Sequence, residues 1–197
     1  QAQELAERYK FLHWELEYAD LFQRRGGFDL TLGNPPWVKV TWDETSFLAE
    51  SEPKIDLRGW SKKRVSDNRV RLIEENGLRA SYLSDYETAE GTQGFLSASQ
   101  NYSKLTGKAN TYKCFLPQGW MIGQDEGVTA YLHPEGVYDD PNGGDFRKGL
   151  YPRLRGHYQF INELNLFADV DHHTTFSVNV YQNAQQKRAQ FTNIVNL

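Results

Sequence analysis

Asn34-Pro35-Pro36-Trp37 is the part of this 197-residue sequence whose residue types most directly indicate chemistry. A residue that precedes proline is pushed out of the helical region, so Asn34 and Pro35 should form a stiff, extended corner. Neither proline has an N–H, whereas the main-chain carbonyls and the Asn34 side-chain oxygen remain hydrogen-bond acceptors. With the flat face of Trp37 beside them, these acceptors suit a planar group that carries an NH2.

An NH2 group on an aromatic ring is a poor nucleophile, because its lone pair is delocalised into the ring. Accepting both of its hydrogens favours a pyramidal nitrogen, which could attack the methyl group of a sulfonium donor in line. Such a transfer needs neither a metal nor a covalent protein intermediate. Trp37 would hold a nucleobase by stacking, worth roughly 1–3 kcal/mol. A base in duplex DNA would first have to be flipped out of the helix.

The corner follows a run that predicts a buried strand. We interpret residues 28–32, with Phe28, Leu30 and Leu32, as a strand covered on both faces within the parallel sheet of an α/β fold. Ligands of such sheets bind just beyond the carboxyl ends of the strands, which is where residues 34–37 would lie.

The rest of the chain alternates between strand and helix patterns, which predicts an α/β fold. Period-two alternation or apolar runs predict strands at 14–18, 127–132, 160–167 and 176–181. Helical patterns cover 2–10, 68–90 (interrupted at Gly77), 110–121 and 145–154, with irregular structure and short helices over 41–70 and a loop over 91–101.

Length and composition fit one globular domain that can build a core, with 39% hydrophobic residues. A single cysteine, Cys114, excludes an internal disulfide framework and suits a reducing compartment. No segment is apolar enough to cross a bilayer, and no signal peptide is visible. Because the sequence starts at Gln1 and its only methionine is Met121, we expect a piece of a larger protein.

The net charge of −4 argues against a general polyanion binder, but the bases are clustered. Residues 52–71 carry seven bases against three acids, and Lys62, Lys63 and Arg64 are consecutive. A second cluster lies at 147–155. Each cluster alone is more often solvated surface than a binding site, yet phosphate contact requires such local clusters.

The residues around the corner resemble those of large bacterial N6-adenine DNA methyltransferases, including fused restriction-modification enzymes and phage-defence methylases. Beside the Asn-Pro-Pro-aromatic signature, the likeness rests on FLHWELEY (11–18), GGFDL (26–30), NTYKCF (110–115) and GVTAYLHPEG (127–136). It spans most of 11–181 and is weakest over 41–105. Ala19 stands where the family commonly has proline, and Trp37 replaces the commoner Tyr or Phe.

The resemblance implies a partial Rossmann-like methyltransferase fold. Residues 1–197 would be a single domain that carries the C-terminal half of the catalytic sheet, and 41–105 would be an insertion on the target-base and DNA side. The implied reaction transfers a methyl group from S-adenosylmethionine to N6 of a flipped adenine. The catalytic corner would consist of Asn34, Pro35, Pro36 and Trp37. The Asn34 side chain and the Pro35 carbonyl would bind the amine, and Trp37 would stack on the adenine. The pocket would be lined by Tyr112 and Phe115.

The glycine-rich donor loop of this family lies upstream of the corner, and the sequence has no equivalent. Gly26-Gly27 precedes the wrong strand and opens no helix. The resemblance therefore puts most of the S-adenosylmethionine site before residue 1, in an upstream remainder of the parent polypeptide. A target-recognition domain and a nuclease domain would be associated with that polypeptide. It also implies double-stranded DNA as partner and the bacterial cytoplasm as location. The basic cluster, and not the resemblance, is the ground for expecting Lys62, Lys63 and Arg64 on the DNA backbone.

Two other functions remain open. A glutamine N5 protein methyltransferase would use the same corner chemistry, so the tetrapeptide does not separate the two. A non-catalytic module with a vestigial pocket would only bind DNA or a partner subunit. The long 41–105 segment and the basic clusters favour nucleic acid.

Asp171-His172-His173 contains metal-ligating residue types, but we expect no metal site there. Adjacent histidines on a strand point to opposite faces, and no cysteine or third histidine has ligand spacing nearby.

Three further groups fit structural roles better than catalytic ones. Cys114 is expected to be a buried, inert thiol. The acid–base types at His133-Pro134-Glu135 fit a strand exit. A nuclease acid-x-lysine arrangement at Glu52-Pro53-Lys54, with Asp43, is discounted because Pro53 separates the two charges.

Overall fold

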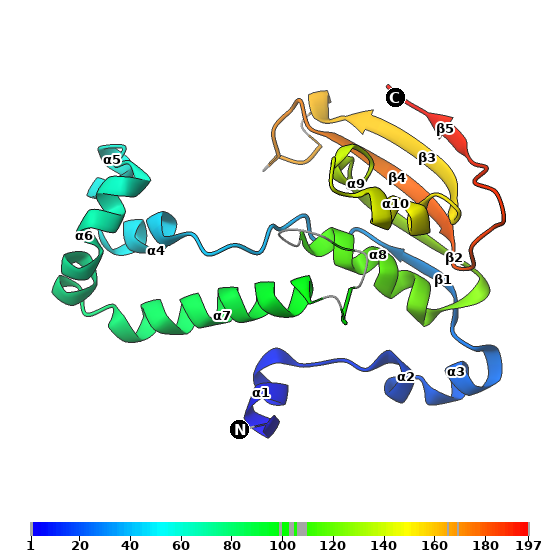
Figure 1. Cartoon of the computed structure of the whole chain (residues 1–197), viewed down its shortest axis with the longest axis horizontal. Coiled ribbons are helices and arrows are strands. Elements are labelled where there is room, and N and C mark those ends of the chain that lie inside the picture. Colours follow the sequence, from blue (N-terminus) through cyan, green and yellow to red (C-terminus); the bar gives the residue numbers. More distant parts are fainter. Residues whose placement is uncertain are drawn as a thin grey trace. The chain divides into compact units, whose positions relative to one another are not determined.

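A computed structural model describes residues 2–98, 100–102, 105, 110–164, 166–168 and 170–196 (Figure 1). The chain divides into two compact units. Unit 1 comprises Gln1–Val38, Lys104–Thr106 and Asn110–Leu197, and unit 2 comprises Lys39–Ser103 and Gly107–Ala109.

Unit 1 is built on a five-stranded sheet in the order β1-β2-β4-β3-β5. Its strands are β1 (Phe28–Gly33), β2 (Gly123–Pro134), β3 (Leu154–Ile161), β4 (Thr175–Gln182) and β5 (Thr192–Ile194). β1 and β2 are parallel, β4 is antiparallel to both of its neighbours, and β5 is parallel to β3. The α/β class is confirmed, but the sheet is mixed, not purely parallel.

Three helices cover one face of this sheet: α8 (Thr111–Ile122), α9 (Gly136–Asp139) and α10 (Gly144–Leu150) (Figure 1). Burial alternates along β2, because only its odd-numbered residues from 127 to 133 point into this layer. The core between helices and sheet consists of Tyr112, Leu116, Tyr131, Val137, Phe146, Leu150, Leu154 and Tyr181.

β1 forms an edge of the sheet and is not covered on both faces. Only β2 pairs with it among the described strands. Leu30 and Leu32 are 59% and 76% exposed, and Val178 on β4 is 37% exposed. Register places Leu32 beside Ala130 and Val178 beside Leu132, so an apolar sheet face opposite the helices remains open to solvent.

The N-terminal helices α1 (Ala2–Tyr9), α2 (Trp14–Glu17) and α3 (Ala19–Arg25) lead into β1. Gly26 ends α3 in the left-handed conformation, with φ of 75°. Gly27, with φ of 146°, lies so close to β2 that a Cβ would be 2.5 Å from the Ile122 carbonyl oxygen. Only glycine fits there, and the turn brings Phe28 into edge contact with the rings of Trp14, Tyr18 and Phe22.

Unit 2 is helical and has its own core. It consists of α4 (Glu44–Ser51), α5 (Lys54–Leu57), α6 (Lys62–Glu75) and α7 (Arg79–Ser97). Asp43 caps α4 by accepting from two main-chain N–H groups, and Ser61 caps α6. The buried residues are Leu48, Ala49, Ile55, Val65 and Leu72.

Several predicted elements were wrong or misplaced. Residues 14–18 form the helix α2 and the following turn, because Trp14 and Tyr18 stack one helical turn apart. The strand expected at 160–167 is β3 at 154–161, followed by a 3₁₀ turn, η1 (Asn162–Leu164). The expected loop at 91–101 is largely the end of α7. In the described residues no helix is both long and apolar enough to span a membrane.

Candidate functional site

The Asn-Pro-Pro-Trp corner lies at the carboxyl end of β1, as the sequence predicted. Asn34 is exposed and Pro35 is buried. The Asn34 side chain makes no hydrogen bond to a described residue, and none donates to the Pro35 carbonyl oxygen. The two acceptors expected to bind an amine are therefore unused within the part of the chain that the structure describes.

Thr111 fixes the next part of the corner. Its hydroxyl donates to the Pro36 carbonyl oxygen at 2.5 Å and accepts from the Val38 N–H at 3.2 Å. The Thr111 N–H donates to the Val38 carbonyl oxygen at 2.9 Å. The start of α8 thus clamps residues 36–38 and leaves Asn34 and Pro35 free. Sequence analysis missed this residue, although it lies in the family-like NTYKCF segment.

Trp37 is half-buried and belongs to the rim of the core. Its ring centroid lies 5.0 Å from that of Phe167 and 6.0 Å from that of Phe176, and both contacts are tilted. Its indole N–H faces the Leu132 carbonyl oxygen at 3.4 Å, which is too long for a strong hydrogen bond. Trp37 therefore contributes to packing as well as to the corner.

A groove of about 400 Å³ runs along β1 to the corner. Asn34, Pro35 and Pro36 form one end of it, and Phe115 from α8 also lines it. The remaining lining is mostly apolar and comes from the β1 edge and the inner side of α8, including Leu30, Leu32, Gln118 and Ile122.

Tyr112 does not line this groove, which corrects the role expected for it. It is 2% exposed and stacks on His133, with ring centroids 5.4 Å apart. Phe115, three positions further along α8, is 42% exposed and lines the groove, whereas the Tyr112 ring is enclosed in the core between the helices and the sheet. Burial, together with the nearby carboxylates of Asp139, Asp140 and Glu135, raises the pKa of Tyr112 far above its ordinary value.

His133 and Glu135 are both enclosed but do not pair with each other. His133 is fully buried and bonds to the Tyr181 hydroxyl at 2.9 Å; burial lowers its pKa to about 4. Glu135 instead bonds to His157 at 3.0 Å and to the Ser177 hydroxyl. This network fastens the loop after β2 to β3 and β4, in agreement with a strand-exit role.

Cys114 is a buried, inert thiol, as expected. It is 4% exposed, and burial raises its pKa to about 11. Asp43 is occupied as the cap of α4, and Glu52 and Lys54 form a weak ion pair at 3.6 Å. These contacts give them structural roles.

The two basic clusters differ in what their cations contact. In the 147–155 cluster every side chain has an internal partner: Arg147 donates to the Asp140 carbonyl, Lys148 pairs with Asp145, Arg153 donates to the Asn183 carbonyl and Arg155 to Gln182. Phosphate contact by that cluster is therefore not favoured.

Lys62, Lys63 and Arg64 begin α6 and are exposed. No described residue forms an ion pair with any of the three, and the Arg64 guanidinium lies 4.2 Å from the Trp60 ring centroid. Elsewhere in α6, Arg69 and Arg71 pair with Glu44 and Glu75. The basic side chains of unit 2 that have no ion-pair partner among the described residues thus include the three that the sequence singled out.

Comparison with known proteins finds no matching family model and no matching curated protein. Among solved structures, a Listeria monocytogenes protein classed as a class I S-adenosylmethionine-dependent methyltransferase is similar to part of the chain, with a TM-score of 0.35 and 14% sequence identity. The match covers 45% of this chain and 28% of that chain.

Proposed function

We propose that the chain binds the target base in an S-adenosylmethionine-dependent DNA methyltransferase that modifies N6 of adenine. The observation that carries the proposal is the corner at the end of β1. Thr111 clamps residues 36–38, while the Asn34 side chain and the Pro35 carbonyl keep free acceptors at the end of a groove.

The proposed chemistry uses these two acceptors. Both hydrogens of the adenine NH2 are accepted by Asn34 and the Pro35 carbonyl, so the nitrogen becomes pyramidal and its lone pair is released from the ring. A nitrogen–carbon bond then forms to the donor methyl as the carbon–sulfur bond breaks. Sulfur keeps the electron pair and becomes a neutral thioether, and the extra proton on nitrogen leaves to water.

The described residues do not supply a site for the methyl donor. Gly26 and Gly27 precede the edge strand and open no helix, and no other glycine-rich loop joins a strand to a helix in the described ranges. We therefore assign the donor site to an upstream part of a longer polypeptide, which would pair with the free edge of β1 and complete a Rossmann-like sheet. Leu30 and Leu32 would then be covered.

DNA is the proposed substrate because of the basic start of α6. Consecutive exposed cations with no ion-pair partner suit phosphates, which dominate protein–DNA affinity. A protein substrate would give these cations no defined role.

The proposal is tested with the longest natural polypeptide that contains these residues, labelled S-adenosylmethionine and unmethylated double-stranded DNA. Label should enter DNA as N6-methyladenine, and Asn34→Ala should reduce the rate at least about a hundredfold, because it removes an acceptor used in the transition state. Asn76→Ala, at an exposed asparagine of unit 2, is the matched control and should leave the rate unchanged.

Four results would overturn the proposal in different ways. Transfer to a glutamine side chain would replace the DNA substrate by a protein. Donor binding without any transfer, or no donor binding at all, would leave a binding module. Equal activity of wild type and Asn34→Ala would remove the corner from the mechanism.

A further inference from the structure

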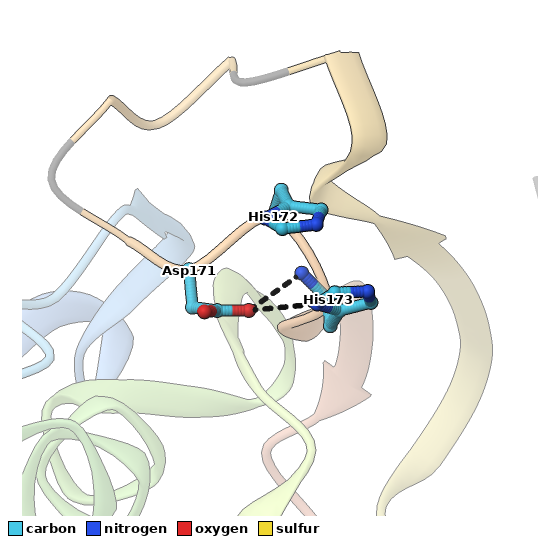
Figure 2. Close-up of side chains that lie close together, drawn as sticks. All are labelled: Asp171, His172 and His173. Carbon is cyan, nitrogen blue, oxygen red and sulfur yellow. Dashed lines mark hydrogen bonds and ion pairs between the residues drawn. The ribbon is translucent and has the colours of Figure 1, made fainter.

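Asp171, His172 and His173 lie in a turn and not on a strand, which removes one of the two reasons for expecting no metal there. The Asp171 carboxylate accepts from the main-chain N–H of His173 at 2.8 Å, and the Asp171 carbonyl accepts from the N–H of Thr174 at 2.9 Å. In a turn, neighbouring side chains can point the same way. Figure 2 shows both imidazole rings beside the Asp171 carboxylate.

The three side chains bring potential ligand atoms together. One atom from each residue lies within 4.8 Å of the other two. The His173 Nδ1 is 3.3 Å from an Asp171 carboxylate oxygen, and the two imidazole centroids are 3.8 Å apart. Bonds from a metal ion to these atoms are about 2.0–2.2 Å long. Side-chain rotations that move the ligand atoms by roughly an ångström would therefore let all three bind one ion.

The loop that carries the turn is held in place from within. Asn162 is fully buried, and its amide donates to the carbonyl oxygens of Phe167 and Val170 at 3.0 Å each. Its main-chain N–H donates to the Thr174 carbonyl oxygen at 3.1 Å, which closes the loop at its base. Val170 directly precedes Asp171, so an ion would bind a turn that is already anchored.

The donor set selects the class of ion. Two imidazoles and one carboxylate favour borderline first-row cations such as Zn²⁺, whereas Mg²⁺ and Ca²⁺ prefer oxygen ligands only. The main-chain N–H of His173 donates to the Asp171 carboxylate and fixes its position in the turn. Both side chains of the Asp171–His173 pair are more than two-thirds exposed, so an ion can enter without opening the core.

We infer that Asp171, His172 and His173 form a binding site for a Zn²⁺-class cation. Three protein ligands leave a fourth position for water or for a group from a partner. The same loop carries Phe167, and the strand after the turn carries Phe176; both contact Trp37. A bound ion would therefore hold this loop in one position against the corner. The site itself does not rest on the proposed methyl transfer.

The test is a calorimetric titration of the metal-free chain with Zn²⁺ alone at about pH 7.5. We expect one equivalent of Zn²⁺ to bind with saturation. His172→Gln, His173→Gln and Asp171→Asn should each weaken binding about tenfold or more, which corresponds to at least about 1.4 kcal/mol.

His13→Gln is the matched control, because His13 is the other exposed histidine in the described part of the chain. It should leave the affinity unchanged, and Mg²⁺ should not compete. Amide hydrogen exchange over 166–174 should slow when Zn²⁺ binds. The absence of saturable binding, wild-type affinity in the three loop variants, or the same loss in His13→Gln would each overturn the site.

Discussion

Glu135 and His157 form the least exposed ion pair among the described residues, with side chains 12% and 9% exposed. Hydrogen bonding to Glu135 raises the pKa of His157 above 6.5, against the opposing effect of burial. Burial alone would raise the pKa of Glu135, but hydrogen bonds from His157, Ser177 and Gln159 lower it below 4.5. Each group therefore stabilises the charged form of the other.

These directions define a pH window for stability. The His157 contribution is fully present below pH 6.5 and is lost as the pH rises through its raised native pKa. The Glu135 contribution is present above pH 4.5 and is lost as the pH falls through its lowered native pKa. The pair should stabilise the fold most between these two limits.

A double-mutant cycle of Glu135→Gln and His157→Gln tests this window. The coupling free energy from urea unfolding should be roughly 1–3 kcal/mol at about pH 5.5 and clearly smaller at about pH 9. His133, whose pKa burial lowers to about 4, titrates in all four variants, so its effect cancels in the cycle. Equal coupling at both pH values would show that the pair acts as neutral hydrogen bonds.

Local chemistry made some residues of the site predictable. The proline-stiffened corner and the buried thiol of Cys114 follow from side-chain types and near neighbours. The Glu135–His157 pair does not, because sheet register brings together two residues that are 22 positions apart. The burial of Tyr112 was not predictable either, because it depends on His133 and the core residues that pack around its ring.

At the scale of elements, the basic residues of α6 fall into two groups. Those at its start form no ion pair with a described residue, whereas Arg69 and Arg71 further along are paired. Replacing Lys62, Lys63 and Arg64 by Gln should weaken DNA binding and lower the slope of log affinity against log salt by about 2–3, since each phosphate contact contributes about 0.9. Fluorescence anisotropy between about 50 and 200 mM salt measures that slope.

The control for this prediction is a variant in which three basic residues outside α6 are replaced, so that the same amount of positive charge is removed. Lys10, Lys187 and Arg188 are exposed, and none forms an ion pair with a described residue. Their replacement by Gln should change the slope much less. Equal slopes for wild type and the α6 variant would exclude phosphate contact by this helix.

Element prediction succeeded where the sequence pattern and the tertiary environment agree. The predicted bounds of β1, α8 and β4 lie close to the observed ones, and the apolar residues of α8 and β4 pack largely as the pattern implies. FLHWELEY has a period of two, yet Trp14 and Tyr18 also match one helical turn, and the helix forms. The open face of β1 could not be foreseen, since an apolar run does not show which elements cover it.

At the scale of the whole molecule, unit 2 is connected to unit 1 at two points of the chain that lie close together. Val38 and Thr111 are hydrogen-bonded neighbours, so the two ends of unit 1 that flank residues 39–109 already meet. The sequence predicted a single domain with an insertion at 41–105. Composition showed the polar stretch but not that its scattered Leu, Ile and Val residues build a separate core.

Replacing residues 39–109, which hold all of unit 2 and also Lys104–Thr106 of unit 1, by a short glycine-serine linker should therefore leave the rest of unit 1 folded. Near-ultraviolet circular dichroism and a cooperative thermal transition would show it. Adding Leu150→Ala, at a fully buried position of unit 1, should then cost roughly 2–5 kcal/mol, as in a native core. A deletion variant without a cooperative transition would mean that unit 1 requires unit 2.

The edge strand β1 also affects how this chain behaves in isolation. An uncovered strand offers a row of free main-chain donors and acceptors, and in β1 the apolar Leu30 and Leu32 accompany them. Lysine or proline commonly protects natural edges, yet between Phe28 and Gly33 the only charge is Asp29. With this edge uncovered, two copies of the chain should be able to pair along β1, and aggregation should rise steeply with protein concentration.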